Sequence, residues 1–337
     1  MAEIVLAMAT THGPQLHTTV EQWQLRVKAD RERKHPFRGG LYSFDELVDM
    51  RRSEDLDARS SMEAQRGYHA RCQAAMAKLA DKWQEIGADV AVVLGNDQDE
   101  IFATDELNPA FMIFYGDKIP NYPQSEAARA SLPPGVAEAE HGHATDAYTE
   151  YPGVPELGAH IVKTMMENEI DVAASKVWPR NARNGASHAF GHIYRQVMRD
   201  KVVPNVPIYQ NTFYPPNQPS AKRAYRFGKV VRQAIDTWPS DKKVAVFASG
   251  GMSHFVIDEE FDRKFVTALG NRDVDFLTSI PLEELQSGTS ELKSWISLAG
   301  VLGADEAEMH EIDYVPCYRS NAGTGTANGF YWWTPKG

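Results

Sequence analysis

The sequence contains very little cysteine: Cys72 and Cys317 are the only two in 337 residues. Two cysteines exclude a disulfide framework and a cysteine-rich zinc site. No apolar run approaches the roughly 18 residues that a membrane span needs. The N-terminal stretch MAEIVLAMATTHGP has no basic region before a long apolar core, so we interpret it as a first strand and not as a signal peptide. We therefore expect a soluble, cytoplasmic protein.

Signatures of several common enzyme classes are missing as well. The sequence has no Gly-x-Ser-x-Gly nucleophile elbow, no phosphate loop and no glycine fingerprint for a dinucleotide. Ser253 stands beside His254 but is not a triad by itself. The net charge of −11 argues against nucleic acid or an anionic membrane as the main partner. It does not exclude an anionic small substrate, because a few local Arg or Lys side chains decide that.

Alternation of apolar runs and amphipathic segments favours an α/β fold. With 42% hydrophobic and 24% charged residues, the chain can form a sizeable core. Strands are expected at residues 4–8, 89–95, 170–173, 203–210 and 243–249, and helices at 61–86, 155–169, 222–237 and between 258 and 300. This order predicts three layers, with a central mostly parallel or mixed sheet flanked by helices, in one domain spanning residues 1–337. Residues 116–157 are expected to form a surface excursion, and the tail from Tyr314 an ordered loop.

Three polar clusters follow expected strands. His12 follows the first strand, residues 96–100 follow the second, and His254 follows the strand at 243–249. A lone loop histidine is usually a surface or hydrogen-bonded residue, an acidic loop is usually only solvated, and Gly-Gly-Met-Ser-His is by itself compatible with a tight turn. Their repeated placement at strand ends favours a functional site, because functional side chains in α/β folds tend to lie there.

At these positions the chain resembles the type III extradiol dioxygenases, the superfamily of the protocatechuate 4,5-dioxygenase β subunit, and within it the 3-O-methylgallate dioxygenase group. The resemblance rests on ordered blocks that cover nearly the whole chain. These blocks are Thr11-His12-Gly13-Pro14, Gly95-Asn96-Asp97-Gln98, Ser187-His188-Ala189-Phe190-Gly191, residues 211–217 (NTFYPPN), residues 249–255 (SGGMSHF), Glu291-Leu292-Lys293-Ser294-Trp295 and residues 314–325.

The resemblance implies a mononuclear Fe(II) site held by two histidines and one carboxylate, which leaves open positions for a substrate and O₂. His12 matches the first histidine, and Glu291 matches the carboxylate. Without the motif, Glu291 would be interpreted as a solvated helix residue. Where most of the superfamily has Asn-Asp-His, this chain has Asn96-Asp97-Gln98. We expect Gln98 in or beside the ligand shell, with Glu100 or a water as the alternatives.

Two further histidines match catalytic positions of the family. His254 matches the acid–base histidine, and a neutral imidazole is suited to take a proton from a catechol near pH 7. His188 matches a histidine that hydrogen-bonds substrate or bound oxygen. His192, one helical turn later, either lines the same pocket or is structural. No role is expected for the remaining histidines: His17, His35, His69, His141, His143, His160 and His310.

The substrate carboxylate needs a cation or amide donors. Arg223, Arg319 and Asn217 are candidates, although a structural ion pair explains either arginine equally well, and Tyr214 offers an aromatic wall or a hydroxyl. We predict extradiol opening of a lignin-derived catecholic acid such as 3-O-methylgallate or gallate, with Fe(II) as cofactor and O₂ as second substrate. The alternatives are cleavage of a hydroxylated biphenyl, a zinc hydrolase or other metal-dependent lyase on the same ligands, and a metal-free paralogue. A homodimer is a further hypothesis.

Overall fold

A nine-stranded mixed sheet forms the centre of the computed structural model, which describes residues 1–103, 105–179, 185–303 and 307–335. The strands follow the order β11-β13-β1-β10-β4-β9-β5-β8, and β12 pairs with β13. Strands β1, β10, β4 and β9 run parallel, whereas β13 and β5 are antiparallel to their neighbours β1 and β9. The strand bounds are β1 Glu3–Thr10, β4 Val90–Gly95, β5 Phe111–Phe114, β8 Ala173–Ser175, β9 Asn205–Gln210, β10 Lys243–Ser249, β11 His254–Val256, β12 Ala307–Tyr318 and β13 Thr324–Pro335.

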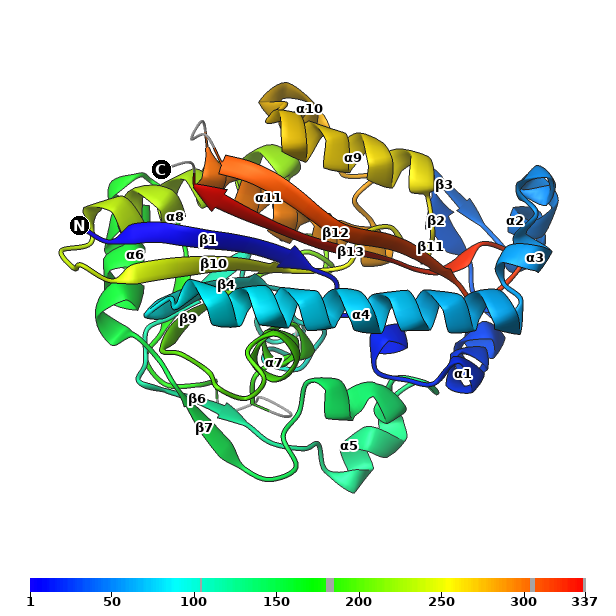
Figure 1. Cartoon of the computed structure of the whole chain (residues 1–337), viewed down its shortest axis with the longest axis horizontal. Coiled ribbons are helices and arrows are strands. Elements are labelled where there is room, and N and C mark those ends of the chain that lie inside the picture. The colour runs from blue at the N-terminus through cyan, green and yellow to red at the C-terminus, as the bar shows by residue number, and fades with distance from the viewer. Residues whose placement is uncertain (104, 180–184, 304–306, 336–337) are drawn as a thin grey trace.

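Helices cover both faces of this sheet (Figure 1). In β1, Leu6 and Met8 join the core that includes the buried face of α4 (Met62–Ile86), whereas Ala7 and Ala9 join the core on the other side. That second core contains α6 (Pro155–Glu167), α8 (Ala221–Thr237) and α11 (Leu292–Leu302). Because successive strand side chains point to opposite faces, a strand covered on both sides reads as one apolar run. The predicted three-layer α/β fold is confirmed.

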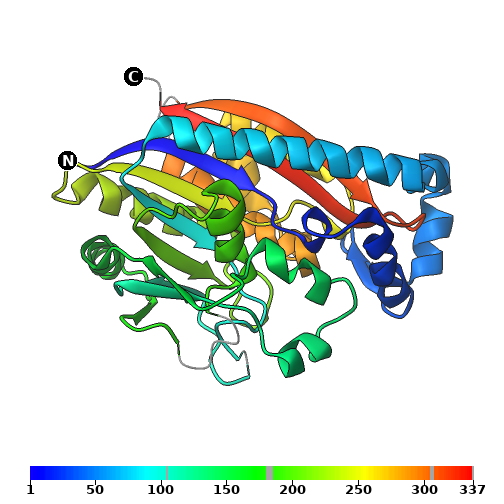
Figure 2. The same cartoon turned by 60° about the horizontal axis from the view of Figure 1, so that its bottom comes forward.

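Smaller elements surround the sheet. They are α1 Val20–Arg31, β2 His35–Phe37, β3 Gly40–Tyr42, α2 Phe44–Met50, α3 Leu56–Arg59, β6 Lys118–Asn121, α5 Glu126–Ser131, β7 Thr149–Pro152, α7 His188–His192, α9 Glu259–Asn271 and α10 Val274–Ser279, with short helical turns η1 Pro14–Leu16, η2 Arg52–Glu54, η3 Ala137–Gly142, η4 Ile193–Val197 and η5 Ser287–Glu291. Figure 1 shows the β6–β7 hairpin and α5 below α7, on the opposite side of the molecule from α9 and α10, and Figure 2 turns this lower part toward the viewer. Among the described helices, none combines the length and the apolar character needed to cross a membrane.

The expected loop after Tyr314 is wrong. Residues 307–318 and 324–335 form a long antiparallel hairpin, β12–β13, and the edge of β13 away from β12 pairs with both β1 and β11. Its Gly and Asn residues concealed the alternation typical of a strand. They are tolerated because β13 has partners on both sides, so tertiary pairing outweighs the weak local propensity. A smaller difference concerns the strand expected at 170–173, since β8 includes only Ala173 of that stretch.

Candidate metal centre and active site

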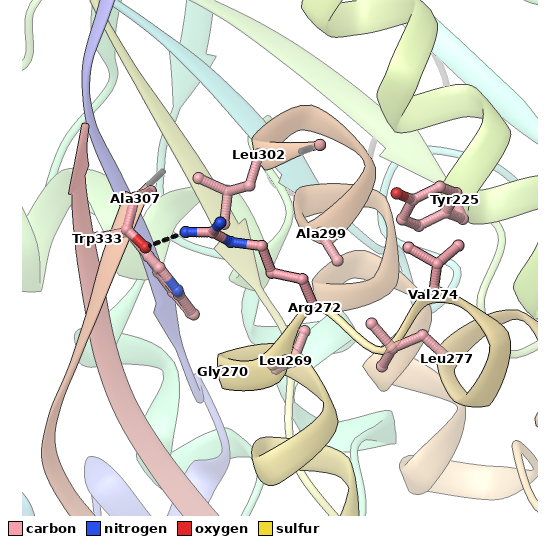
Figure 3. A pocket seen from close by; sticks show the side chains of 11 residues that line it. Tyr225, Leu269, Gly270, Arg272, Val274, Leu277, Ala299, Leu302, Ala307 and Trp333 are labelled. Carbon is pink, nitrogen blue, oxygen red and sulfur yellow. Dashed lines mark hydrogen bonds between the residues drawn. The ribbon is translucent and has the colours of Figure 1, made fainter. Parts of the chain in front are cut away.

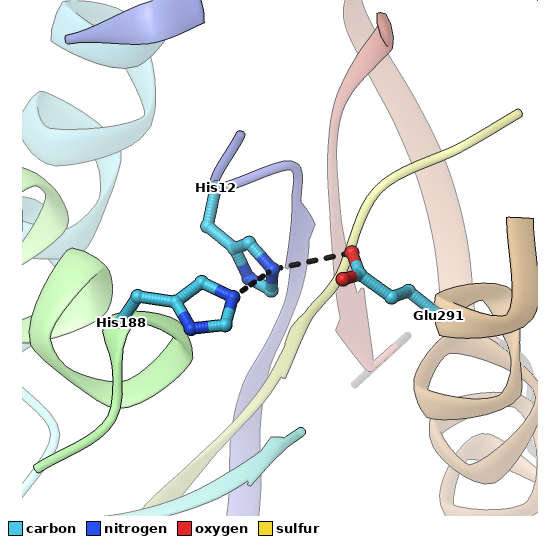
Figure 4. A group of neighbouring side chains, drawn as sticks. All are labelled: His12, His188 and Glu291. Atoms are coloured by element: carbon cyan, nitrogen blue, oxygen red, sulfur yellow. Dashed lines mark hydrogen bonds and ion pairs between the residues drawn. The ribbon is translucent and has the colours of Figure 1, made fainter. Parts of the chain in front are cut away.

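Three side chains converge beyond the carboxyl ends of the parallel strands. His12 follows β1, His188 begins α7, and Glu291 ends η5 just before α11. Their ligand atoms all lie within 4.8 Å of one another, and Figure 4 shows them pointing toward a common point. Two imidazoles and one carboxylate are the donor set of non-haem Fe(II) sites that keep positions open. The donor chemistry therefore fits the implied metal.

Hydrogen bonds fix the protonation of His12, which is 5% exposed. The Nδ1 atom lies 2.8 Å from the Ser249 hydroxyl, and that hydroxyl donates its one proton to the Ala189 carbonyl at 2.7 Å. Because the hydroxyl then only accepts from the ring, Nδ1 carries the proton and Nε2 keeps a free lone pair. Burial lowers the pKa of His12, against the opposing effect of Glu291. The ring is thus arranged as a neutral donor through Nε2.

The Glu291 carboxylate is buried and ionised. Its Oε2 atom lies 3.2 Å from His12 Nε2 and accepts a hydrogen bond from the Gly251 backbone at 2.6 Å. Its Oε1 atom accepts from the amides of Asn96 at 3.0 Å and Gln98 at 3.3 Å. Burial raises the pKa of Glu291, but His12 and His254 outweigh it and hold the pKa below its usual range. This carboxylate therefore supplies a negative charge to any cation at the centre.

A carboxylate also orients His188. Glu100 accepts from the His188 backbone at 2.9 Å, and its Oε2 atom lies 2.5 Å from the ring Nδ1. The other ring nitrogen, Nε2, lies 3.1 Å from Nε2 of His12. Burial lowers the pKa of His188, but the charge and hydrogen bond of Glu100 raise it further, to about 9. Without a metal, a proton on His188 separates the two nitrogens, and that proton must leave when a metal binds.

The shape of the loop after β4 explains how Glu100 reaches His188. The carboxylate of Asp97 accepts hydrogen bonds from the backbone N–H groups of Glu100, Ile101 and Phe102 at 3.2, 2.8 and 3.1 Å. These bonds turn the chain so that the Glu100 side chain faces α7. Burial and the nearby Glu100 charge raise the pKa of Asp97 to about 7.

His254 lies beside the three converging side chains and is set up as a proton acceptor. Its Nδ1 atom is 2.7 Å from the Met252 carbonyl, which can only accept, so Nδ1 carries a proton in the neutral ring. Its Nε2 atom lies 3.7 Å from Glu291 Oε2. A Cβ atom at Gly251 would lie 2.2 Å from the His254 ring, so only glycine lets the backbone pass this closely.

The residue that departs from the family pattern lies close to the centre. Gln98 is half-buried and directs its amide nitrogen toward Glu291. Only the amide oxygen of Gln98 can bind a metal, whereas its amide nitrogen is the atom that faces Glu291. The role of Gln98 as a metal ligand therefore stays a prediction.

The expected substrate-binding residues occupy different surroundings. Arg319 is buried and uses its guanidinium on Asp30 and Gln15. Arg223 is exposed on α8 and lies over the Phe111 ring. Asn217 is exposed and donates to the Asn108 carbonyl at 2.9 Å. Tyr214 is half-buried, and burial followed by the charges of Asp99 and Asp97 raises its pKa. Their substrate contacts stay predictions.

Three further histidines surround this centre: His192, for which the sequence left a pocket-lining and a structural role open, and His17 and His143, for which it predicted no role. His17 Nε2 lies 3.1 Å from His192 Nδ1, and the His192 ring lies 6.4 Å from the His12 ring. The His143 ring lies 6.2 Å from that of His188. Burial lowers the pKa of His17 to about 3 and that of His143 to about 4, so both are neutral at pH 7. The spacing of four residues from His188 indicated His192, but nothing in the sequence singled out the other two.

A pocket between α8, α9, α10, α11, β12 and β13 lies apart from the candidate metal centre. Figure 3 shows its mostly apolar lining, in which the Arg272 guanidinium donates to the Ala307 carbonyl at 2.7 Å. None of the residues that converge at His12 lines it.

Comparisons with known proteins found a family model, a partly matching relative and a solved structure of low similarity. Residues 62–328 match the family model described as the catalytic LigB subunit of aromatic ring-opening dioxygenase, a range that includes the candidate site residues other than His12. Over 109 residues the chain is 35% identical to a gallate dioxygenase of Pseudomonas putida, covering 29% of this chain and 32% of that enzyme, so the match spans about a third of the relative. A solved structure of an uncharacterized Escherichia coli K12 protein has 12% identity and a TM-score of 0.40, covering 76% of this chain and 91% of that one.

Proposed function

Since the chain belongs to the family of the catalytic LigB subunit of aromatic ring-opening dioxygenases, we propose that it is a non-haem Fe(II) extradiol dioxygenase. Its substrate is a lignin-derived catecholic acid, with gallate and 3-O-methylgallate as the leading candidates, and both atoms of O₂ enter the product. The partial match to a gallate dioxygenase supports this substrate class. The observation that carries the proposal is the convergence of two imidazoles and a carboxylate beside His254.

We assign the metal to His12, His188 and Glu291, with Gln98 next to it. His12 and His188 each have one nitrogen occupied by a protein partner and Nε2 directed to the centre. A metal-bound histidine commonly has its other nitrogen held in this way, and the Glu100–His188 pair is such an arrangement. In this assignment His188 takes the place of the histidine that Gln98 replaces in the sequence motif.

The bound iron would supply a shared coordination site for a catecholate and O₂. The protein supplies the proton chemistry and the positioning. His254 takes a proton from a substrate hydroxyl on its free Nε2, because Nδ1 is committed to the Met252 carbonyl. The charged ring then faces Glu291, and it can return the proton as the ring opens.

Anaerobic reconstitution tests this function. The protein is loaded with Fe(II) or with Zn²⁺ and assayed in an oxygen electrode with gallate, 3-O-methylgallate, protocatechuate and hydroxylated biphenyls. We expect oxygen uptake with iron and an aromatic acid, and incorporation of both ¹⁸O atoms into the product by mass spectrometry. Turnover with zinc in the absence of oxygen would indicate a hydrolase or lyase, and failure to bind any metal would indicate a metal-free paralogue.

Alanine variants test the ligand assignment through iron content. His12→Ala and Glu291→Ala should lose most of the bound iron while circular dichroism shows a preserved fold. His188→Ala distinguishes its two roles, because loss of a ligand lowers iron occupancy, whereas loss of a hydrogen bond to substrate leaves iron bound. Full iron occupancy in any of these variants would remove that residue from the ligand set.

The proposal also covers the domain extent, the cellular location and the oligomeric state of the protein. Residues 1–337 act as one catalytic domain, in the cytoplasm, as a homodimer. Light scattering of the purified chain measures the oligomeric state, and a monomer would contradict the last point.

A further inference from the structure

Arg26 is a buried cation for which the described residues provide no carboxylate partner. It lies in α1 and is only 8% exposed. Within the part of the chain that the structure describes, its Nη1 atom is buried without a hydrogen-bond partner, and Arg26 forms no ion pair. A guanidinium is always charged at neutral pH, and a buried charge without a partner costs several kcal/mol. Binding of an anion beside Arg26 would offset this cost.

The neighbouring charges further destabilise the unpaired Arg26 guanidinium. Arg33 and Arg319 lie close enough to act electrostatically on Arg26, and Asp30 is the one nearby carboxylate that offsets them. Asp30 is already engaged, since it accepts from Arg319 at 2.7 and 2.9 Å and from Arg33 at 3.3 Å. Burial, followed by the charges of Arg319 and Arg33, lowers the pKa of Arg26 to about 10, so it remains protonated. Three cations thus share one anion.

This cluster adjoins the candidate active site through Phe255. The guanidinium carbons of Arg33 and Arg26 lie 4.4 and 5.9 Å from the centre of the Phe255 ring. The same ring lies 5.5 Å from the ring of His254, the residue before it. The Phe255 ring is therefore a neighbour of both the arginine cluster and the His254 ring.

We propose that Arg26 binds the carboxylate of the aromatic acid whose hydroxyls face His12, His188, Glu291 and His254. The inference rests on the proposed function, for which it names the group that recognises the acid. A guanidinium matches a carboxylate in geometry and charge, and a substrate carboxylate would supply the anion that the cluster lacks. Arg319 is not a candidate for binding this carboxylate, because its Nε and Nη2 atoms already donate to the two Asp30 carboxylate oxygens. Arg223 does not either, because it is exposed over Phe111 on α8.

Paired ligands that differ only in charge test the proposal. Binding of gallate and of its neutral amide, 3,4,5-trihydroxybenzamide, is measured by anaerobic calorimetry on iron-loaded wild type, Arg26→Gln and Arg31→Gln. Arg31 is the matched control, since it lies on the same helix but is exposed and stacks on Phe44. We expect Arg26→Gln to weaken gallate binding roughly 10- to 100-fold, as for loss of a charged hydrogen bond, with little change for the amide. Arg31→Gln should change neither, and Arg26→Lys should recover part of the gallate affinity.

Two further measurements distinguish this inference from the proposed function. Benzoate and benzamide carry no hydroxyls for a metal, so benzoate should raise the Tm of wild type and of Arg31→Gln, but not of Arg26→Gln. Without ligand, Arg26→Gln should melt no lower than Arg31→Gln, whereas a structural role would lower its Tm. Equal losses for gallate and its amide, or benzoate stabilisation that survives in Arg26→Gln, would overturn the inference even if the enzyme opens aromatic rings. Conversely, Arg26-dependent benzoate binding without oxygen uptake would support the inference and refute the proposed function.

Discussion

Replacing Asp30 by Asn should destabilise the protein more than almost any other change of one charge. Asp30 is fully buried and accepts from Arg319, Arg33 and the Thr324 hydroxyl, the last at 2.8 Å. An amide offers one acceptor oxygen and directs its NH₂ group at donors. It also leaves three arginines without any anion. Removing one partner of a buried ion pair typically costs about 3–5 kcal/mol, and we expect a loss of that size in the free energy of unfolding.

Urea denaturation followed by tryptophan fluorescence at pH 7 measures this loss. Asp49→Asn is the matched control, because Asp49 pairs with Arg52 at 2.7 Å on the surface. An exposed pair of this kind is worth about 0–1 kcal/mol. Adding Arg26→Gln to Asp30→Asn should restore part of the stability, since it removes a repelling charge. A loss for Asp30→Asn no larger than that of the control would show that another group balances the arginines.

The pH dependence of the difference in unfolding free energy between wild type and Asp30→Asn provides a second check. Burial raises the pKa of Asp30, but Arg319, Thr324 and Arg33 outweigh it and lower the pKa to about 2, from an ordinary value of 3.8. A depressed carboxyl pKa adds stability above the ordinary value, and this contribution is lost as the pH falls through the folded-state value. The shift corresponds to roughly 2 kcal/mol. The stability gap between wild type and Asp30→Asn should therefore narrow between about pH 4 and pH 2.

Three further changes concern the candidate centre. Glu100→Gln should weaken metal binding about 10- to 100-fold, as loss of the partner that orients a ligand does, and competition with a chelating dye measures it; unchanged affinity would mean that His188 is not a ligand. His254→Gln should keep iron and substrate but reduce turnover about 10²- to 10⁴-fold; a rate per bound iron close to wild type would assign proton transfer to another group, with His188 the first to test. Gln98→His should raise iron affinity. An unchanged affinity would show that the side chain at position 98 lies too far from the metal to bind it.

Much of the fold was predictable because its central strands are covered on both faces. Burial on two sides makes β4 and β10 continuous apolar runs, and the predicted strands at 89–95 and 243–249 match them closely. The hairpin β12–β13 escaped prediction because its pairing partners are remote in sequence. Local preference gave no indication that residues 324–335 would pair with β1 and β11.

The strand ends and the motifs predicted which residues come together at the candidate site, but they did not predict the hydrogen bonds that position those residues. His12, His254 and Glu291 come together as the motifs indicated. The Glu100–His188 pair and the Asp97 turn that supports it depend on a loop shape that has no periodic pattern in sequence. Arg26 went unnoticed because an arginine within a charged helix is usually solvated, and only the structure shows that this one is buried.

The position of β13 has a consequence for biosynthesis. Among the described strands β13 comes last along the chain, yet one of its edges pairs both with β1, which leads to His12, and with β11, which begins with His254. In the sheet, β11 pairs with β13 alone, through His254 opposite Thr326, Phe255 opposite Gly325 and Val256 opposite Thr324. A chain that has not yet been translated through these residues has no partner strand for β11, which begins with His254. Premature termination before Thr324 should therefore leave His254, the proposed proton acceptor, without the strand that β11 pairs with.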